Sequence, residues 1–314
     1  MAKSVRVGKI DLDTCGATFL LGISREEKVV VVRGEAASSD LNDGEVICIE
    51  VGGSGQMALN NWDHHAEDGP KHSATSQVGY CLAKPECFCG AFHWGIVEEE
   101  DLRNTCEAKW VSGGSYEVAS LIGYINLLDT KGPEAIRQQT GGDVLFPTLS
   151  DVFAGMLLTE RDPVEQLHKG VELLRDVLAT GQNPWGTISG FDSYALAKAG
   201  NNRRVAEAVE QAEWQTTASG LKLAHLETDF FGAPGALYGV GAKVVVAYSP
   251  HFGSARVPKF TVAGNGVRVD AVLAELNARE SGWGGPPTGT IIGSPRDGST
   301  LTLSVVVDIV RKGL

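Results

Sequence analysis

The chain has 314 residues, and 27 lysines and arginines against 39 aspartates and glutamates give it a formal net charge of −12. This balance counts against tracking along long nucleic acid, because that affinity comes from clustered cations that release counterions. The apolar fraction of 43% with 21% charged residues is typical of a globular protein. Since single cores rarely grow beyond roughly 250–300 residues, we expect two domains.

The first half of the chain predicts alternating strands and helices. Short apolar runs between charged or glycine-rich segments indicate strands that are buried on both faces of a parallel sheet. We expect these strands at residues 5–10, 29–32 and 46–51. Helices are expected from residue 16 and at residues 73–83, 98–108 and 116–128. The alternation is typical of an α/β domain with a parallel sheet.

The pattern changes to helices alone between residues 149 and 214. There Asp162 is predicted to be a helix N-cap, with Pro163 at the first helical position and Glu165 closing a capping box, and the helix is expected to run to Gly181.

A smaller α+β domain is predicted beyond this helical region. Its expected elements are strands at residues 221–226, 243–248, 259–262 and 300–310, and a helix at residues 269–279. The predicted organisation is therefore an α/β domain at residues 1–148, a helical connector at 149–215 and a second domain at 216–314.

Acidic residues follow two of the predicted strands. Alternation along an extended first strand would send Asp11 and Asp13 to the same side, as two ligands of one cation require. The alternative is that one of them caps the following helix. Glu50 ends a buried-looking strand, and an acid at such a position needs a partner or a metal ion.

Two further motifs carry groups that bind divalent cations. Asp63-His64-His65 follows another predicted strand, and one imidazole of such a motif can bind a metal while the other faces a substrate. Asp129 ends an apolar segment, where an ordinary acid at a helix end is the alternative. A histidine pair is as common in a surface turn, so the prediction of a site depends on all four motifs together.

In this order, the motifs resemble those of the DHH phosphoesterase superfamily: Asp-x-Asp, an acid after a middle strand, Asp-His-His and a later Asp. Residues 282–289 (GWGGPPTG) are similar to the Gly-Gly-His-Pro loop of the DHH-associated domain. The sequence from residues 50–53 (EVGG) to the Asp-His-His motif looks most like exopolyphosphatase-related and MYG-type members. The resemblance extends from Asp11 to Gly289 and so covers both predicted domains.

The resemblance implies hydrolysis of a phosphoester with two Mn²⁺ or Mg²⁺ ions, which activate water and neutralise charge on the leaving oxygen. Carried over by position, the implied metal ligands are Asp11, Asp13, Glu50, Asp63, His64 and Asp129. Within the Asp63-His64-His65 motif, which would be catalytic, His65 would contact the scissile phosphate.

Other residues are expected on the substrate side of the site. Gly284 and Gly285 would bring backbone N–H groups against the ligand, since only glycine permits that approach. Arg296, Arg256 and Lys259 are candidates for holding a non-reacting phosphate, with a solvated surface cation as the alternative for each.

The predicted function is metal-dependent hydrolysis of a small phosphorylated compound in a cleft between the two domains. Short oligonucleotides, nucleotide derivatives and polyphosphate are the expected substrates, and the family resemblance suggests a homodimer. One alternative is a protein of the same fold that binds a phosphorylated ligand without hydrolysing it. Another is an interaction protein whose cleft is idle.

The sequence departs from the family pattern in three ways. Val7 and Lys9 stand where a metal-binding histidine usually precedes Asp-x-Asp, Glu50 stands in place of an Asp, and Pro286 in place of the loop histidine. Lys9 suggests that an ammonium group supplies the charge of one metal ion and contacts the phosphorylated ligand, so that the centre binds one ion or none. The alternative is a lysine that extends into solvent.

The six cysteines all lie at or before Cys106. A candidate zinc site has the spacing Cys-x5-Cys-x-Cys-x3-His with one later cysteine and comprises Cys81, Cys87, Cys89, His93 and Cys106. Since paired Cys-x2-Cys knuckles are missing, free thiols are the favoured interpretation. Residues 1–13 lack the apolar core of a signal peptide, and no run approaches the ~20 apolar residues of a membrane span, so we expect a cytoplasmic protein with no membrane partner.

Overall fold

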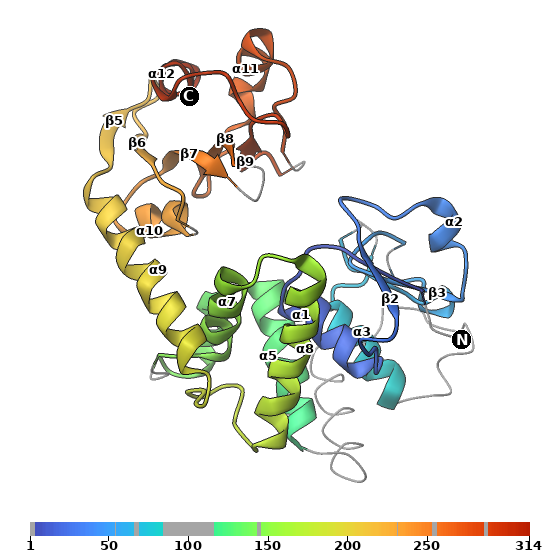
Figure 1. The fold of residues 1–314 in the computed structure, drawn as a ribbon. Helices are drawn as coiled ribbons and strands as arrows, with labels where there is room; N and C mark the ends of the chain where they lie inside the picture. The colour runs from blue at the N-terminus through green and yellow to red at the C-terminus, as the bar shows by residue number, and fades with distance from the viewer. Residues whose placement is uncertain are drawn as a thin grey trace. The chain divides into compact units, whose positions relative to one another are not determined.

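The computed structural model describes residues 4–53, 55–65, 69–83, 116–142, 146–230, 232–252, 256–285 and 288–314. The chain divides into two compact units, residues 1–198 and residues 199–314 (Figure 1). The predicted helix at residues 98–108 lies outside the described residues, and the division into three parts stays a prediction. None of the described helices is long and apolar enough to cross a membrane.

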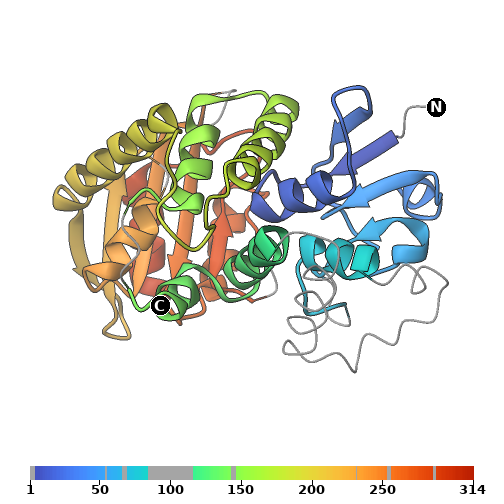
Figure 2. The same ribbon diagram turned by 90° about the horizontal axis from the view of Figure 1, so that it is seen from below.

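The first unit contains the parallel sheet that the sequence predicts. Four strands lie in the order β2-β1-β3-β4, and each neighbouring pair is parallel (Figure 2). Their bounds are β1 Ser4–Val7, β2 Lys28–Val31, β3 Val46–Ile49 and β4 Asn61–Trp62. Because the carboxyl ends of parallel strands meet at one edge of a sheet, the segments that follow β1, β3 and β4 start near one another.

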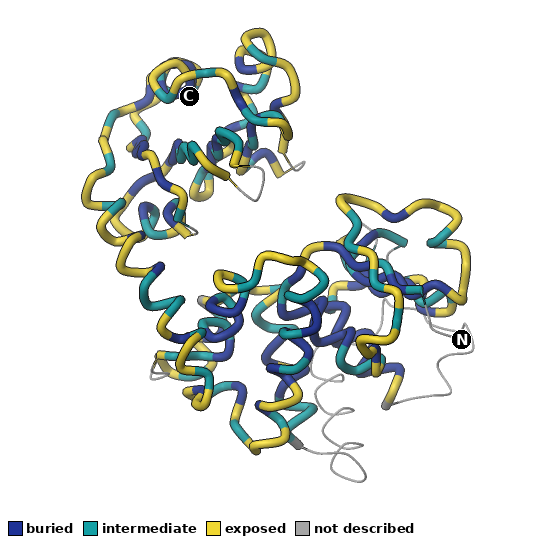
Figure 3. Tube along the Cα trace, viewed as in Figure 1, coloured by how far each residue is buried: buried dark blue, intermediate teal, exposed yellow. Residues whose placement is uncertain are grey.

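Both faces of this sheet are covered, which explains why β3 is apolar throughout. Ile47 and Ile49 belong to the main core of the unit, whereas Val46 and Cys48 pack in a small cluster with Ala36 on the other face. The buried segments of the main core stand out in Figure 3. The remaining elements of this unit are α1 Leu12–Leu20, α2 Ser38–Leu41, η1 Met57–Leu59, α3 Ala74–Ala83, α5 Tyr116–Lys131, α6 Pro133–Gln139, α7 Leu149–Thr159 and α8 Pro163–Ala179.

Helix α8 begins where the sequence predicts, with Asp162 as its N-cap. Asp162 accepts hydrogen bonds from the backbone N–H groups of Val164 and Glu165, both at 2.9 Å. The predicted capping box is wrong, because the N–H of Asp162 donates to Oε1 of Glu160 at 3.0 Å instead of to Glu165. The helix ends just before Gly181, whose φ of 66° suits a glycine.

The second unit contains a mixed sheet in the order β5-β6-β7-β8-β9, in which β6 and β7 are parallel and the other pairs antiparallel. One face packs against α11 and α12, and the other against α9 and α10. Helix α9 (Asp192–Glu210) begins in the first unit and continues into the second. The other bounds are β5 Glu213–Thr216, β6 Lys222–Glu227, α10 Ala233–Gly239, β7 Val244–Phe252, β8 Val257–Gly264, η3 Asp270–Val272, α11 Leu273–Arg279, β9 Ile291–Gly293 and α12 Leu303–Gly313.

The strand predicted at residues 300–310 is wrong, because most of this segment forms α12. Thr302 is the N-cap, and its side chain accepts the N–H of Val305. Val306, Val307 and Val310 are buried against the sheet at helical spacing. The β-branched residues favour a strand by local propensity, but burial of one helical face outweighs this preference.

Candidate metal centre

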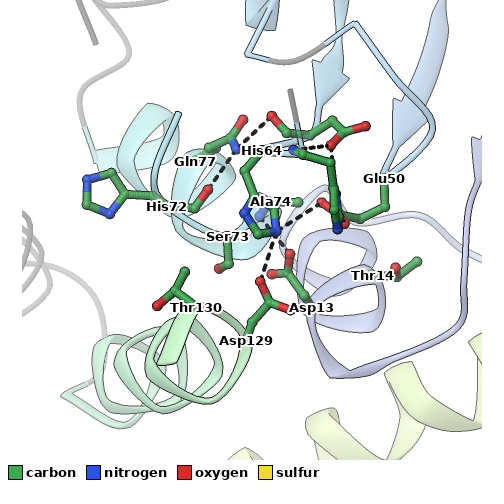
Figure 4. A network of polar contacts seen from close by, with 12 residues as sticks. Asp13, Thr14, Glu50, His64, His72, Ser73, Ala74, Gln77, Asp129 and Thr130 are labelled. Carbon is green, nitrogen blue, oxygen red and sulfur yellow. Dashed lines mark hydrogen bonds and ion pairs between the residues drawn. The ribbon is translucent and has the colours of Figure 1, made fainter. Parts of the chain in front are cut away.

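Most of the predicted acids and histidines of the first unit come together at the carboxyl edge of its sheet (Figure 4). Glu50 directly follows β3, and His64 follows β4 by one residue. Asp13 lies in the first turn of α1, and Asp129 lies near the end of α5. A hollow of about 770 Å³ opens there, with Glu50 and Asp129 in its lining.

The expected placement of Asp11 and Asp13 on an extended strand is wrong, because β1 ends at Val7 and α1 begins at Leu12. Asp11 is the N-cap of α1, and its Oδ1 accepts the N–H of Thr14 at 3.0 Å. Asp13 is only 2% exposed. One acid therefore caps the helix and the other is buried in the unit.

The carboxylate of Asp13 is oriented by the start of α3. Its Oδ2 accepts the N–H of Ala74 at 2.7 Å, and its Oδ1 accepts the N–H of Thr75 at 2.8 Å. Each carboxylate oxygen retains a second lone pair that can bind a cation. Burial, followed by repulsion from Glu50 and Asp129, raises the pKa of Asp13 to about 7. A bound cation would offset both effects.

Glu50 combines backbone strain with a buried, unsatisfied oxygen. Its φ of 57° lies in the left-handed region, which residues other than glycine rarely adopt. Oε2 lies 3.0 Å from Nδ1 of His65, whereas Oε1 is buried without a hydrogen-bond partner among the described residues. Burial raises the pKa of Glu50, although His65 and His64 oppose the shift. Strain and an unpaired buried oxygen at one residue indicate a functional role.

His64 stands among three carboxylates. Its Nε2 lies 2.9 Å from Oδ2 of Asp129 and 3.8 Å from Oε1 of Glu50. The same nitrogen has no hydrogen bond of acceptable geometry within the described part of the chain. Burial acts to lower the pKa of His64, but Asp129 and Glu50 outweigh it and raise the pKa.

The ligand atoms of Asp13, His64 and Asp129 all lie within 4.8 Å of one another. Carboxylate oxygens and an imidazole nitrogen that converge without hydrogen bonds among themselves are the arrangement that a divalent cation at their centre requires. The unpaired Oε1 of Glu50 faces the same nitrogen. These residues therefore fit one divalent ion.

Asp63 positions His65. Its oxygens accept the N–H groups of Gly52 and His65, and Oδ1 lies 2.9 Å from Nδ1 of His65. Burial acts to raise the pKa of Asp63, but the hydrogen bonds from His65 and Gly52 outweigh it and lower the pKa. Hydrogen bonds to Asp63 and then Glu50 raise the pKa of His65 to about 10. These contacts favour the charged form of His65, which lies in the lining of the hollow with its side chain 67% exposed.

Lys9 lies beyond the end of β1, so it does not share a strand face with the acids. Its side chain is 85% exposed, and Nζ lies 4.0 Å from Oδ2 of Asp11. Lys9 therefore extends into solvent beside Asp11, at the rim of the same hollow.

The glycines predicted to contact the ligand have other roles in the second unit. The N–H of Gly284 donates to the carbonyl of Gly293 at 3.1 Å, so this group is engaged within the second unit, and its contact with a ligand stays a prediction. A Cβ on Gly285 would lie 2.0 Å from the carbonyl oxygen of Ile291, which explains that glycine by close packing of the chain. Pro286 lies outside the described residues.

The three cations predicted for the second unit differ in their contacts. The ammonium group of Lys259 donates to the carbonyl oxygens of Ser294 and Pro295. Arg256 and Arg296 are exposed. Lys259 is therefore engaged by its own unit, and the role of the two arginines stays a prediction.

Of the predicted zinc ligands, only Cys81 lies within the described residues. It is buried in α3, with Sγ 3.3 Å from Sδ of Met57. The zinc site stays a prediction, because its other members lie outside the described part of the chain: Cys87, Cys89, His93 and Cys106.

Two residues that the sequence pattern did not indicate, Gly8 and Gln77, contact the backbone of the residues that form the centre. A Cβ on Gly8 would lie 2.1 Å from the carbonyl oxygen of Glu50, so only glycine lets β1 approach this acid. The side chain of Gln77 donates to the carbonyls of Asp63 at 3.2 Å and His72 at 2.9 Å. Gly8 could have been identified from the sequence, because a glycine between a predicted strand and an acidic motif indicates a close approach of the backbone. Gln77 could not, because its role depends on tertiary contacts.

No protein-family model and no curated protein matches this sequence. Three solved chains show structural similarity. One, described as a member of the s1p family of ribosomal proteins with a DHH domain, has 11% identity and a TM-score of 0.35 over 93% of this chain and 82% of that chain. Another, an uncharacterized protein from Helicobacter pylori, has 12% identity and a TM-score of 0.28 over 99% of each chain. The chain thus has a distant structural match to a DHH-domain protein and no family assignment from its sequence.

Proposed function

We propose that this chain is a DHH-type phosphoesterase that hydrolyses a small phosphorylated compound with the help of Mn²⁺ or Mg²⁺. The observation that carries the proposal is the convergence of Asp13, His64 and Asp129 beside the unpaired Oε1 of Glu50. A ligand set of carboxylates with one imidazole suits Mn²⁺ and is compatible with Mg²⁺. Short oligonucleotides, nucleotide derivatives and polyphosphate are the proposed substrates.

The residues of the centre fall into two roles, binding of the metal ion and binding of the phosphoryl group, according to their charge and exposure. Asp13, His64, Asp129 and Glu50 would hold the ion, which when bound supplies an activated water and charge neutralisation at a phosphoryl group. His65 is anchored through Nδ1, so its Nε2 remains to donate a hydrogen bond to a phosphoryl oxygen. Because its pKa of about 10 keeps the ring protonated near neutral pH, His65 suits stabilisation of negative charge in the transition state.

The proposal is tested by hydrolysis of bis-p-nitrophenyl phosphate and of a short oligonucleotide with added Mn²⁺. We expect turnover by the wild type, and loss of both turnover and Mn²⁺ binding in Asp129→Asn. Asp176→Asn is the matched control, because Asp176 is exposed near the end of α8 and does not line the hollow. This control is expected to keep wild-type turnover.

Absence of Mn²⁺-dependent turnover on both substrates would overturn the hydrolase assignment. If pyrophosphate with Mn²⁺ then still raised the melting temperature, the result would favour the alternative, a protein that binds phosphorylated ligands without hydrolysing them.

A further inference from the structure

We propose that the centre holds a single divalent ion, and that Lys9 and Arg33 supply the further positive charge that a ligand with two or more phosphate groups requires. This inference rests on the proposed function, since it takes the ligand to be a phosphorylated compound. It departs from the two-ion centre that the family resemblance implies.

The described residues leave no complete ligand set for a second ion. They contain two groups of at least three potential ligands close enough to hold a metal: Asp13 with His64 and Asp129, and Glu50 with His64 and His65. Both groups include His64, and its Nε2 faces Asp129 and Glu50 together. Because one imidazole nitrogen binds one ion, the two groups are alternatives for the same ion.

Among the described residues, the other acids that line the hollow belong to neither of these groups: Asp11, Glu35 and Asp63. Oδ1 of Asp11 caps α1 through the N–H of Thr14, and its Oδ2 faces the ammonium group of Lys9. Asp63 accepts hydrogen bonds from Gly52 and His65 through both of its oxygens. A lysine ammonium has no lone pair to offer a metal, so Lys9 brings positive charge without coordination.

Lys9 stands between two hollows of the first unit. The hollow of about 770 Å³ contains the metal centre, and a neighbouring one of about 410 Å³ is lined by Arg33, Leu157 and Gln166. The two share Gly8, Lys9, Val32 and Gly34 in their linings. A ligand can therefore extend from the centre past Lys9 toward Arg33.

The charges of the smaller hollow favour an anion. In the part of the chain that the structure describes, its lining contains Lys9 and Arg33 and no acid, whereas acids line the larger hollow around the metal centre. Within the described residues Arg33 has no ion pair, and Lys9 has only the 4.0 Å approach to Asp11. An ammonium and a guanidinium that are not neutralised by the protein are the groups that bind phosphate oxygens. The structure thus favours a ligand with a second phosphate group beyond the one at the metal.

The test uses the full chain and pyrophosphate as the probe. Bound manganese is counted by elemental analysis after dialysis against Mn²⁺, and pyrophosphate affinity is measured by calorimetry at saturating Mn²⁺. The variants are Lys9→Met and Arg33→Met. Lys28→Met is the matched control, because Lys28 is exposed at the start of β2, the opposite end of that strand from Arg33.

We expect one Mn²⁺ per chain in the wild type and in all three variants. Loss of one charge-assisted contact should weaken pyrophosphate binding by about tenfold in Lys9→Met and in Arg33→Met, and leave Lys28→Met unchanged. Two Mn²⁺ per wild-type chain, or wild-type pyrophosphate affinity in both variants, would overturn the inference. No bound Mn²⁺ at all would instead remove the proposed function, and so the two failures are distinguishable.

Discussion

The buried carboxyl group of Asp13 makes the stability of the metal-free protein fall as the pH rises. Its pKa is about 7 in the folded protein, against an ordinary value of 3.8. Between these values the folded state keeps a proton that the unfolded state has lost. The free energy of unfolding decreases with pH wherever the folded state binds more protons, so this contribution is lost from pH 4 upward and levels off above about pH 7.

The size of this effect follows from the shift. One such group lowers the free energy of unfolding by about 1.4 kcal/mol for each pH unit between the two pKa values. Over the interval from 3.8 to about 7 the loss amounts to roughly 4 kcal/mol. This is a large part of the total of about 5–15 kcal/mol that holds a typical domain folded.

Asp13→Asn removes the titrating group and therefore most of this slope. Urea unfolding in EDTA between about pH 4.5 and 6.5 should give a slope less negative than that of the wild type by about 1.4 kcal/mol per pH unit. The penalty for placing an amide opposite the N–H groups of Ala74 and Thr75 is constant with pH and does not affect the comparison. Asp176→Asn should keep the wild-type slope. Equal slopes in the wild type and Asp13→Asn would show that the folded protein does not hold a proton on Asp13 over this range.

Three other substitutions test separate parts of the structure. Gly8→Ala places a methyl group 2.1 Å from the carbonyl oxygen of Glu50. Urea unfolding should therefore show that the free energy of unfolding falls by about 1–3 kcal/mol, and calorimetry should show a weaker affinity for Mn²⁺. An unchanged affinity would show that Gly8 does not position Glu50. Glu50→Gly removes the strain of a non-glycine residue at positive φ and a buried carboxylate, so the free energy of unfolding of the metal-free protein should rise by about 1 kcal/mol. Mn²⁺ should raise the melting temperature of this variant less than that of the wild type. A metal-free variant less stable than the wild type would contradict this expectation. Thr302→Ala removes the N-cap of α12 and should cost about 1 kcal/mol without a change in Mn²⁺ affinity; a changed affinity would mean that this cap matters to the centre.

The sequence predicts those parts of the centre whose positions follow from the order of the strands along the chain and from their parallel arrangement in the sheet. Apolar runs predicted β1, β2 and β3. Because β4 also lies parallel to β3, Glu50 and His64 emerge at one edge of the sheet. The local cap of α8 was also predictable, because Asp162 and Pro163 act through neighbours in the sequence.

Other features depend on tertiary contacts that the pattern does not carry. The burial of Asp13 requires α3 to supply two N–H groups from more than sixty residues away. The helical state of α12 is favoured by one buried face against a sheet, contrary to the propensity of its valines. The positive φ of Glu50 and the pairing of Gly284 with Gly293 likewise follow from the packing of neighbouring segments.

The metal centre is tested most directly by the anomalous scattering of crystals soaked with Mn²⁺, measured near the manganese absorption edge. We expect one strong peak, within bonding distance of Asp13, His64 and Asp129 and beside Oε1 of Glu50. Absence of a peak among these four residues, at a Mn²⁺ concentration that saturates binding in solution, would contradict the proposed metal centre.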